Sequence, residues 1–312
     1  MSELRPLLNY TIQVICSLGT VIMNPVVLIR QFRRLKKHNQ LTMIFAHLFM
    51  HSTFACATLC LSSYDLYVLL DPNIPANHEV EFWLANAVDA TNLIIGLADV
   101  FLALDRYLAI TFPFRYATKL MKKTMQLALL SALICSGVSF GLHPFFRIPV
   151  PQSDDPLPIM VMVNFTVIFT RVTVKNCFDV AYVLVTFVFI VKLRRHNAKV
   201  LIHSRDVGHD NVGFKLANSI VLYQTVLQLA LCIGPLFIGA YLLRICFGID
   251  VKASLGPFTT TLATIYLLAC MDYHLFDDRS ELPTCKFKSV KGPVVLKQPM
   301  SRVRSGNGSY AR

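Results

Sequence analysis

The chain has 312 residues, of which 54% are hydrophobic and only 15% are charged. Soluble domains carry about 25% charged residues, so a soluble chain of this composition would lack the polar surface needed to face water. The composition therefore requires lipid as the solvent. The formal net charge of +12 does not indicate nucleic-acid binding, because the basic residues fall mostly in short tracts between apolar runs. That distribution is typical of cytoplasmic loops.

Seven apolar stretches are long enough to cross a bilayer, which takes about 20 residues per helix. They cover residues 7–29, 41–70, 82–112, 124–146, a fifth that begins between 172 and 176 and ends at 191, 216–243 and 251–276. We therefore predict an all-α membrane protein, a seven-transmembrane helix bundle formed by residues 1–276. Residues 277–312 are basic and contain several prolines, and they are predicted to form a disordered cytoplasmic tail attracted to anionic lipid.

The apolar residues 160–174 do not fit this scheme easily. Joining them to the fifth span would place Arg171 and Lys175 deep in lipid, at a cost of roughly 2.5–3.5 kcal/mol for each unpaired charge. β-Branched and aromatic residues also alternate here with a period of two. We therefore expect a strand-like extracellular loop that lies over the helix bundle.

The basic residues also predict the orientation. Most of the 30 lysines and arginines lie in the loops after the first, third and fifth spans and in the tail. The side with the basic loops is cytoplasmic, so the N-terminus is expected outside. The sequon at Asn164 then lies in an extracellular loop and predicts glycosylation there. Cys285, beneath the seventh span, is a candidate for palmitoylation.

A sequence motif stands at the predicted cytoplasmic end of the third span. Residues 103–116 read ALDRYLAITFPFRY. This segment resembles the DRY motif and the loop that follows it in rhodopsin-like G-protein-coupled receptors. The resemblance implies a coupling switch at Asp105, Arg106, Tyr107 and Pro113. The acid can neutralise the arginine at rest, and its release would offer a five-donor guanidinium to a G protein.

Other positions agree with this family in part. Asn24 resembles the polar asparagine of the first helix, and Pro235 lies in a CIGP sequence that resembles the bend of the sixth. The NPxxY sequence of the seventh helix, the cysteine at the outer end of the third and the acid of the second are missing, and Lys215 stands where many relatives have an acid. Such divergence resembles the nematode serpentine chemosensory receptors, and segments 216–218 and 255–258 resemble their class BC branch.

The third span carries a polar or small face formed by Asp89, Asn92, Gly96, Asp99, Ala103 and Arg106. Polar faces of membrane helices point into the bundle or a cavity. Asp89 could contact a ligand or form a structural hydrogen bond between helices. Asp99 could join a polar switch with His47 or His51, or be hydrogen-bonded in the core. We group Asn24, Asp99 and Pro235 as helix-core switch residues. The candidate ligand-binding residues are Asp89, Asn92, Asp179 and Gln228; a Lys175–Asp179 pair at the membrane surface is the alternative for Asp179.

The predicted function is a chemosensory receptor that detects a small, odorant-like external ligand and activates a heterotrimeric G protein. The expected partners are that ligand, the G protein and membrane lipid, at the plasma membrane; by the resemblance, a sensory cilium is one such location. Enzymatic chemistry, cofactors and metal sites are not predicted. His47 and His51 are four residues apart and could ligate a metal, but no acid lies between them in a protease pattern. The alternatives are a divergent neuropeptide or neurotransmitter receptor, and a transporter or ligand-gated channel.

Overall fold

A computed structural model describes residues 4–35, 42–71, 73–149, 159–203, 221–236 and 258–280. The regular structure in these ranges is helical, apart from one isolated antiparallel bridge between Arg147 and Val163. The prediction of an all-α protein is therefore confirmed for the part of the chain that is described.

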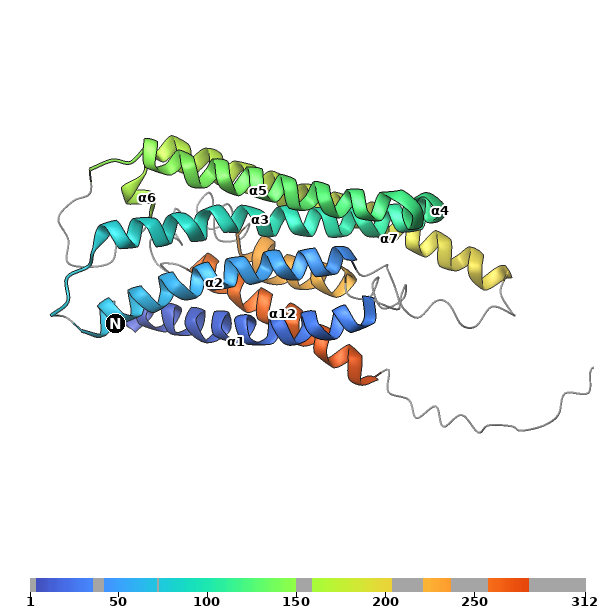
Figure 1. Cartoon of the computed structure of the whole chain (residues 1–312), viewed down its shortest axis with the longest axis horizontal. Coiled ribbons are helices and arrows are strands. Elements are labelled where there is room, and N and C mark those ends of the chain that lie inside the picture. The colour runs from blue at the N-terminus through green and yellow to red at the C-terminus, as the bar shows by residue number, and fades with distance from the viewer. Residues whose placement is uncertain are drawn as a thin grey trace, which may run out of the picture.

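The long helices run side by side along the long axis of the molecule (Figure 1). They are α1 (Leu4–Leu35), α2 (Thr42–Leu70), α3 (His78–Thr111), α5 (Met121–Phe145), α7 (Phe165–His203) and α12 (Phe258–Ser280). Short elements connect or extend them: α4 (Pro113–Arg115), the π-helix η2 (Tyr116–Leu120), α6 (Ile159–Met162), the π-helix η3 (Leu229–Ile233) and α9 (Gly234–Leu236).

Helix α3 is the inner helix of the bundle. It packs against α2, α5 and α7, while α1 packs against α2 and α12. The largest buried apolar cluster joins α1, α2, α3, α5 and α7 through side chains such as Leu48 of α2, Leu102 of α3 and Phe189 of α7. A polar residue on any face of α3 that meets these neighbours is consequently enclosed by protein.

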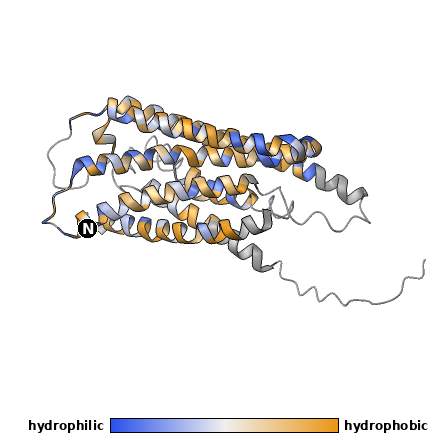
Figure 2. Ribbon diagram, viewed as in Figure 1, coloured by the Kyte–Doolittle hydropathy of each residue, from blue (hydrophilic) through white to orange (hydrophobic). Residues whose placement is uncertain are grey.

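Four of the helices are long and apolar enough to cross a membrane: Pro6–Ile29, Met43–Leu70, Pro113–Phe145 and Phe165–Arg195. Two shorter apolar helices cover Val221–Ile233 and Thr259–Cys270. Large apolar side chains such as Leu133 and Phe187 are exposed on the outer helices, and hydrophobic residues cover much of their length in Figure 2. Such an extended apolar surface is suited to lipid.

The predicted strand-like loop at residues 160–174 is wrong. These residues form the single turn α6 and then, from Phe165 onward, the start of α7. Asn164 begins this helix, because its Oδ1 accepts a hydrogen bond from the backbone N–H of Thr166 at 2.9 Å. The expected cost of placing Arg171 and Lys175 inside a long helix does not arise, since each has a carboxylate partner. The fifth span therefore also begins earlier than predicted.

The segment after α5 is fastened to the first turns of α3. The guanidinium of Arg147 lies 2.5 Å from a carboxylate oxygen of Glu79 and 4.5 Å from the ring centre of Phe82. Trp83 Nε1 also donates to Glu79, at 2.9 Å. The hydrogen bonds from Arg147 and then from Trp83 hold the pKa of the exposed Glu79 below its usual value. These contacts join the start of α3 to the segment after α5.

The helix Val221–Ile233 ends in the π turn η3, directly before Gly234 and Pro235. The N–H of Gly234 bonds to the carbonyl of Leu229, five residues earlier. A Cβ atom on Gly234 would lie 2.7 Å from that carbonyl oxygen, which is too close for any side chain. Glycine at this position therefore permits the π turn, and π turns and prolines are the features at which helices kink.

We predict that Gly234→Ala destabilises the fold by about 1–3 kcal/mol, because the new methyl group clashes with rigid backbone. The matched control is Gly137→Ala in α5, where a Cβ would meet nothing within 4 Å. The control should be neutral or slightly stabilising, since alanine favours helix over glycine. Thermal unfolding of the purified variants in detergent measures both, and equal effects at the two positions would contradict this account of Gly234.

Candidate functional site

Polar side chains are buried at several levels of α3, and three of these groups involve an aspartate of this helix. We call the end of the bundle at which α3 finishes the DRY end, and the end at which α3 begins the opposite end. In Figure 1 the DRY end is on the right. The first group surrounds Arg106 at the DRY end, the second surrounds Asp99 in the middle, and the third surrounds Asp89 toward the opposite end.

At the DRY end, Arg106 is fully buried and held by its neighbour in sequence. Its Nε donates to Oδ2 of Asp105 at 3.0 Å, and its Nη2 donates to the same oxygen. The hydroxyl of Tyr116 lies 2.8 Å from both carboxylate oxygens of Asp105 and accepts a hydrogen bond from Arg106 Nη2 at 3.1 Å. Asp105, Arg106 and Tyr116 thus form a closed network that neutralises the guanidinium in the protein interior.

The backbone after α3 brings Tyr116 into this network. The short helix α4 begins with the exposed Pro113, and η2 then turns the chain so that Tyr116 points back to α3. Tyr107 is half-buried and packs on the main apolar cluster. No role was predicted for Tyr116 from the sequence. This tyrosine is the last residue of the ALDRYLAITFPFRY segment, ten positions after Arg106, and its place in the motif could have indicated a role.

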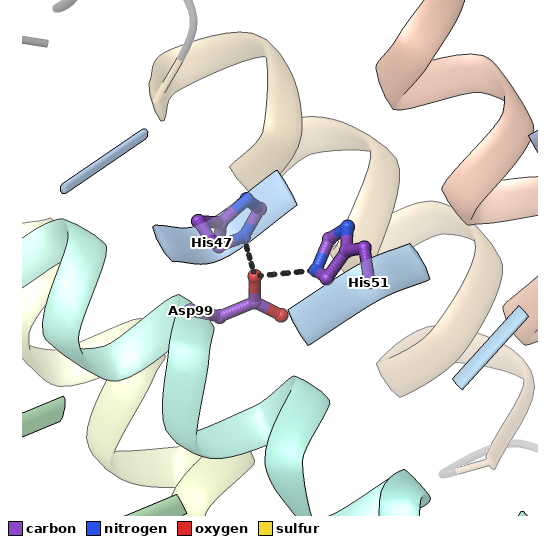
Figure 3. A group of neighbouring side chains, drawn as sticks. All are labelled: His47, His51 and Asp99. Atoms are coloured by element: carbon purple, nitrogen blue, oxygen red, sulfur yellow. Dashed lines mark hydrogen bonds and ion pairs between the residues drawn. The ribbon is translucent and has the colours of Figure 1, made fainter. Parts of the chain in front are cut away.

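In the middle of the bundle, Asp99 meets two histidines of α2 (Figure 3). Its Oδ1 lies 2.7 Å from His47 Nε2, 3.4 Å from the hydroxyl of Tyr266, and 3.7 Å from His51 Nε2, which is beyond hydrogen-bond reach. The two imidazole ring centres are 3.9 Å apart. Asp99 is therefore hydrogen-bonded in the core and also adjacent to both histidines.

The other two helix-core switch residues occupy different places. Asn24 of α1 is buried, and its Nδ2 donates to Ser52 Oγ at 2.5 Å, next to His51 in sequence. Asn24 and Asp99 consequently contact neighbouring turns of α2. Pro235 lies in α9, directly after the π turn.

Toward the opposite end there are two ion pairs. One joins α3 to α7, and the other lies within α7 beside that contact. Arg171 Nη1 lies 2.9 Å from Asp89 Oδ1 and 3.3 Å from the carbonyl oxygen of the same residue. One turn further along α7, Lys175 Nζ lies 2.8 Å from Asp179 Oδ2, which is the local pair expected from their spacing. Both side chains of the Asp89–Arg171 pair are 13% exposed. A Cβ at Gly96 would lie 3.4 Å from Asp179 Oδ1, so the glycine allows α7 to approach α3 closely.

The remaining candidates are placed less specifically. Asn92 is half-buried on α3, and Gln228 is buried with an Oε1 that has no hydrogen-bond partner among the described residues. Asn164 is exposed at the start of α7, where its side-chain nitrogen remains available for a glycan. Cys285 and Lys215 lie outside the described residues. A shallow hollow of about 380 Å³ lies at the opposite end, lined by His78, Arg147, Ile148 and Pro149.

Comparison with known families agrees with this arrangement. Residues 3–146 match the family model described as serpentine type 7TM GPCR chemoreceptor Srbc. This part of the chain is similar to the serpentine receptors. The match ends directly before Arg147 and includes α1, α2, α3 and α5, and with them the Asp105–Arg106–Tyr116 network. It confirms the resemblance drawn from the DRY segment, and with the apolar helices it indicates a membrane protein. No curated protein matched the chain.

We predict that the Asp89–Arg171 pair stabilises the contact between α3 and α7. Asp89→Asn or Arg171→Gln leaves the other charge buried, and each should lower the free energy of unfolding by about 3 kcal/mol. The double substitution should cost clearly less than the sum, because the two side chains contact each other. Chemical denaturation in detergent gives the coupling energy.

The matched control for this cycle is the Glu79–Arg147 pair, whose side chains are 57% and 30% exposed. Exposed pairs of this kind contribute about 1 kcal/mol or less. Equal coupling energies in the two cycles would contradict the importance assigned to the buried pair.

Proposed function

We propose that the chain is a chemosensory G-protein-coupled receptor of the plasma membrane. In this proposal residues 1–276 cross the membrane seven times with the N-terminus outside, and residues 277–312 form a cytoplasmic tail that meets anionic lipid. A small external ligand binds toward the opposite end of the bundle, and the DRY end activates a heterotrimeric G protein. The family match, the apolar helices and the basic loops of the sequence support this proposal.

The observation that carries the proposal is the burial of Arg106. Among the largest side chains that are fully buried in the described ranges, it is the charged one. A guanidinium is stable in such surroundings only when its donors are paired, and Asp105 and Tyr116 supply that pairing. A network that is stable but composed of only three side chains is suited to a two-state switch. Breaking it frees a cation with several donors at the end of the bundle where a G protein would bind.

The ligand-binding end is proposed to centre on Asp89 and Arg171. Within the described residues, Asp89 Oδ2 and Arg171 Nε have no hydrogen-bond partner, although both atoms are buried. A small ligand with a polar or charged group can satisfy one of these atoms and compete for the pair. Asp89 lies 17 residues before Arg106, about 25 Å along α3 at 1.5 Å per residue. The ligand therefore acts at a distance, by favouring one packing of the helices over another.

A neuropeptide or neurotransmitter receptor would use the same DRY-end network and would differ only in the ligand. A transporter or channel is disfavoured by that network, because solute movement gives no reason to bury an Asp–Arg–Tyr group at one end of α3. The two classes are separated by whether the response depends on Arg106.

We predict that Arg106→Ala abolishes ligand-dependent G-protein activation when it is compared with the unaltered chain at equal amounts on the cell surface. Tyr116→Phe should have the opposite effect on the basal state. It removes a hydrogen bond to a charged group, which contributes about 1.5–3 kcal/mol, so the resting equilibrium should shift toward the active state by about tenfold or more. Energy-transfer assays of G-protein dissociation in cells, under a panel of volatile and soluble small molecules, measure both effects.

The control is Lys119→Ala, an exposed basic residue in η2 at the same end of the bundle. It should leave the basal signal and the ligand response unchanged. An N-terminal tag stained on intact cells reports surface delivery and tests the orientation of the chain. An ion or solute flux that persists in Arg106→Ala without G-protein activation would overturn the receptor function in favour of a transporter or channel.

A further inference from the structure

His47, His51 and Asp99 form a buried cluster that the proposed receptor mechanism does not use. All three side chains are buried, with exposed fractions of 0%, 1% and 1%. One ligating atom from each residue lies within 4.8 Å of those of the other two. Figure 3 shows both imidazoles turned toward the same carboxylate, from one helix onto its neighbour.

Several atoms of this cluster lack a hydrogen-bond partner among the described residues. They are Nδ1 of His47, both ring nitrogens of His51 and Oδ2 of Asp99. A neutral imidazole has one N–H donor and one lone pair, so His51 is buried with neither satisfied. Unsatisfied polar atoms in a protein interior are costly. His51 therefore needs a partner, and the facing side chains do not provide one at hydrogen-bond distance.

We propose that His47, His51 and Asp99 bind a divalent transition-metal ion of the zinc type. Two imidazoles and a carboxylate are a ligand set that zinc uses, whereas hard cations such as sodium and calcium prefer oxygen ligands. The histidines are four residues apart on α2, so they lie on the same face of that helix. The third ligand is Asp99 of α3, which lies far from both histidines in the sequence and is brought to them by the packing of α3 on α2.

The distances are compatible with such an ion after small side-chain shifts. Ligand atoms around a tetrahedral zinc with bonds near 2.0–2.1 Å lie about 3.3 Å apart. Asp99 Oδ1 lies 2.7 Å from His47 Nε2 and 3.7 Å from His51 Nε2, one distance below this value and one above it. The hydroxyl of Tyr266 donates a hydrogen bond to the same oxygen at 3.4 Å and would orient the carboxylate toward the ion.

A metal at this position would bind α2 to α3 directly, with Tyr266 of α12 beside it. The inference does not depend on the proposed receptor function, because it concerns the affinity of the core for an ion and not signalling. Its consequence is a bundle whose stability rises with free zinc, since a ligand that binds only the folded chain stabilises it by mass action.

The test uses the purified full-length chain in lipid nanodiscs, stripped with a chelator and then titrated with Zn²⁺ or Co²⁺. We expect one tightly bound ion per chain and a rise in Tm of about 5 °C at one hundred times Kd. His51→Gln should lower the affinity by about tenfold or more and abolish the rise. The matched control is His143→Gln, because His143 is also buried but bonds to Asn86 at 2.6 Å instead of a carboxylate.

A second variant keeps the test decisive if His51→Gln fails to fold. His51→Cys retains a metal ligand, so with Co²⁺ it should show a thiolate-to-metal charge-transfer band that the unaltered chain lacks. Failure of the unaltered chain to bind either ion would overturn the proposal. So would an affinity that is unchanged in His51→Gln, or a thiolate band in the unaltered chain, since each would place the metal elsewhere.

Discussion

A charge inside an apolar helix bundle must have a partner, and this constraint organises the structure around α3. Three aspartates of the buried interior, Asp89, Asp99 and Asp105, are each matched by a basic or imidazole side chain within ion-pair distance. In a medium of low dielectric constant, an unmatched carboxylate or guanidinium would cost more than the packing of a few apolar side chains returns. The positions of α2 and α7 against α3 are therefore fixed by polar pairs as well as by apolar packing.

The contact between α3 and α7 illustrates the point. The Asp89–Arg171 pair sets the register of the two helices, and Gly96 lets α7 come close enough for Asp179 to lie against α3. A slip of α7 by one residue would rotate Arg171 by about 100° away from its partner. Apolar side chains of the main buried cluster, which includes Ile94 of α3 and Phe189 of α7, could accommodate such a slip more easily because dispersion is not directional.

The sequence alone was enough to predict an α-helical membrane protein and the position of the DRY segment, because both depend on local patterns. The Lys175–Asp179 pair was predictable for the same reason, since i and i+4 side chains face each other on a helix. The Asp89–Arg171 pair was not, because its members are 82 residues apart and only packing brings them together.

This pair also explains why the strand predicted at residues 160–174 is wrong. The free-energy cost that argued against a long helix applies to an unpaired arginine in lipid, but not to an arginine that faces a carboxylate. The period-two pattern did not mark one buried face either: Val163 is buried, whereas Phe165 and Phe169 of α7 are exposed.

The distance between the two ends of α3 limits how the proposed signal can travel. The members of the Asp105–Arg106–Tyr116 network are at most 11 positions apart in the sequence, so the network cannot sense the opposite end through its own contacts. A signal from Asp89 and Arg171 must pass through movement of whole helices. Helix α7 is joined to the helix Val221–Ile233 by a hydrogen bond of 2.7 Å between the hydroxyls of Tyr182 and Thr225.

The helix Val221–Ile233 ends at the π turn and Pro235, where the regular pattern of backbone hydrogen bonds is already interrupted. A shift of α7 against α3 can therefore be taken up at η3 without breaking a regular helix. Bending elsewhere in the helix Val221–Ile233 would break intact backbone hydrogen bonds inside an apolar medium, which is the more costly alternative. The most economical path between the two ends thus runs from Arg171 along α7, through Tyr182 and Thr225, to the hinge before Pro235.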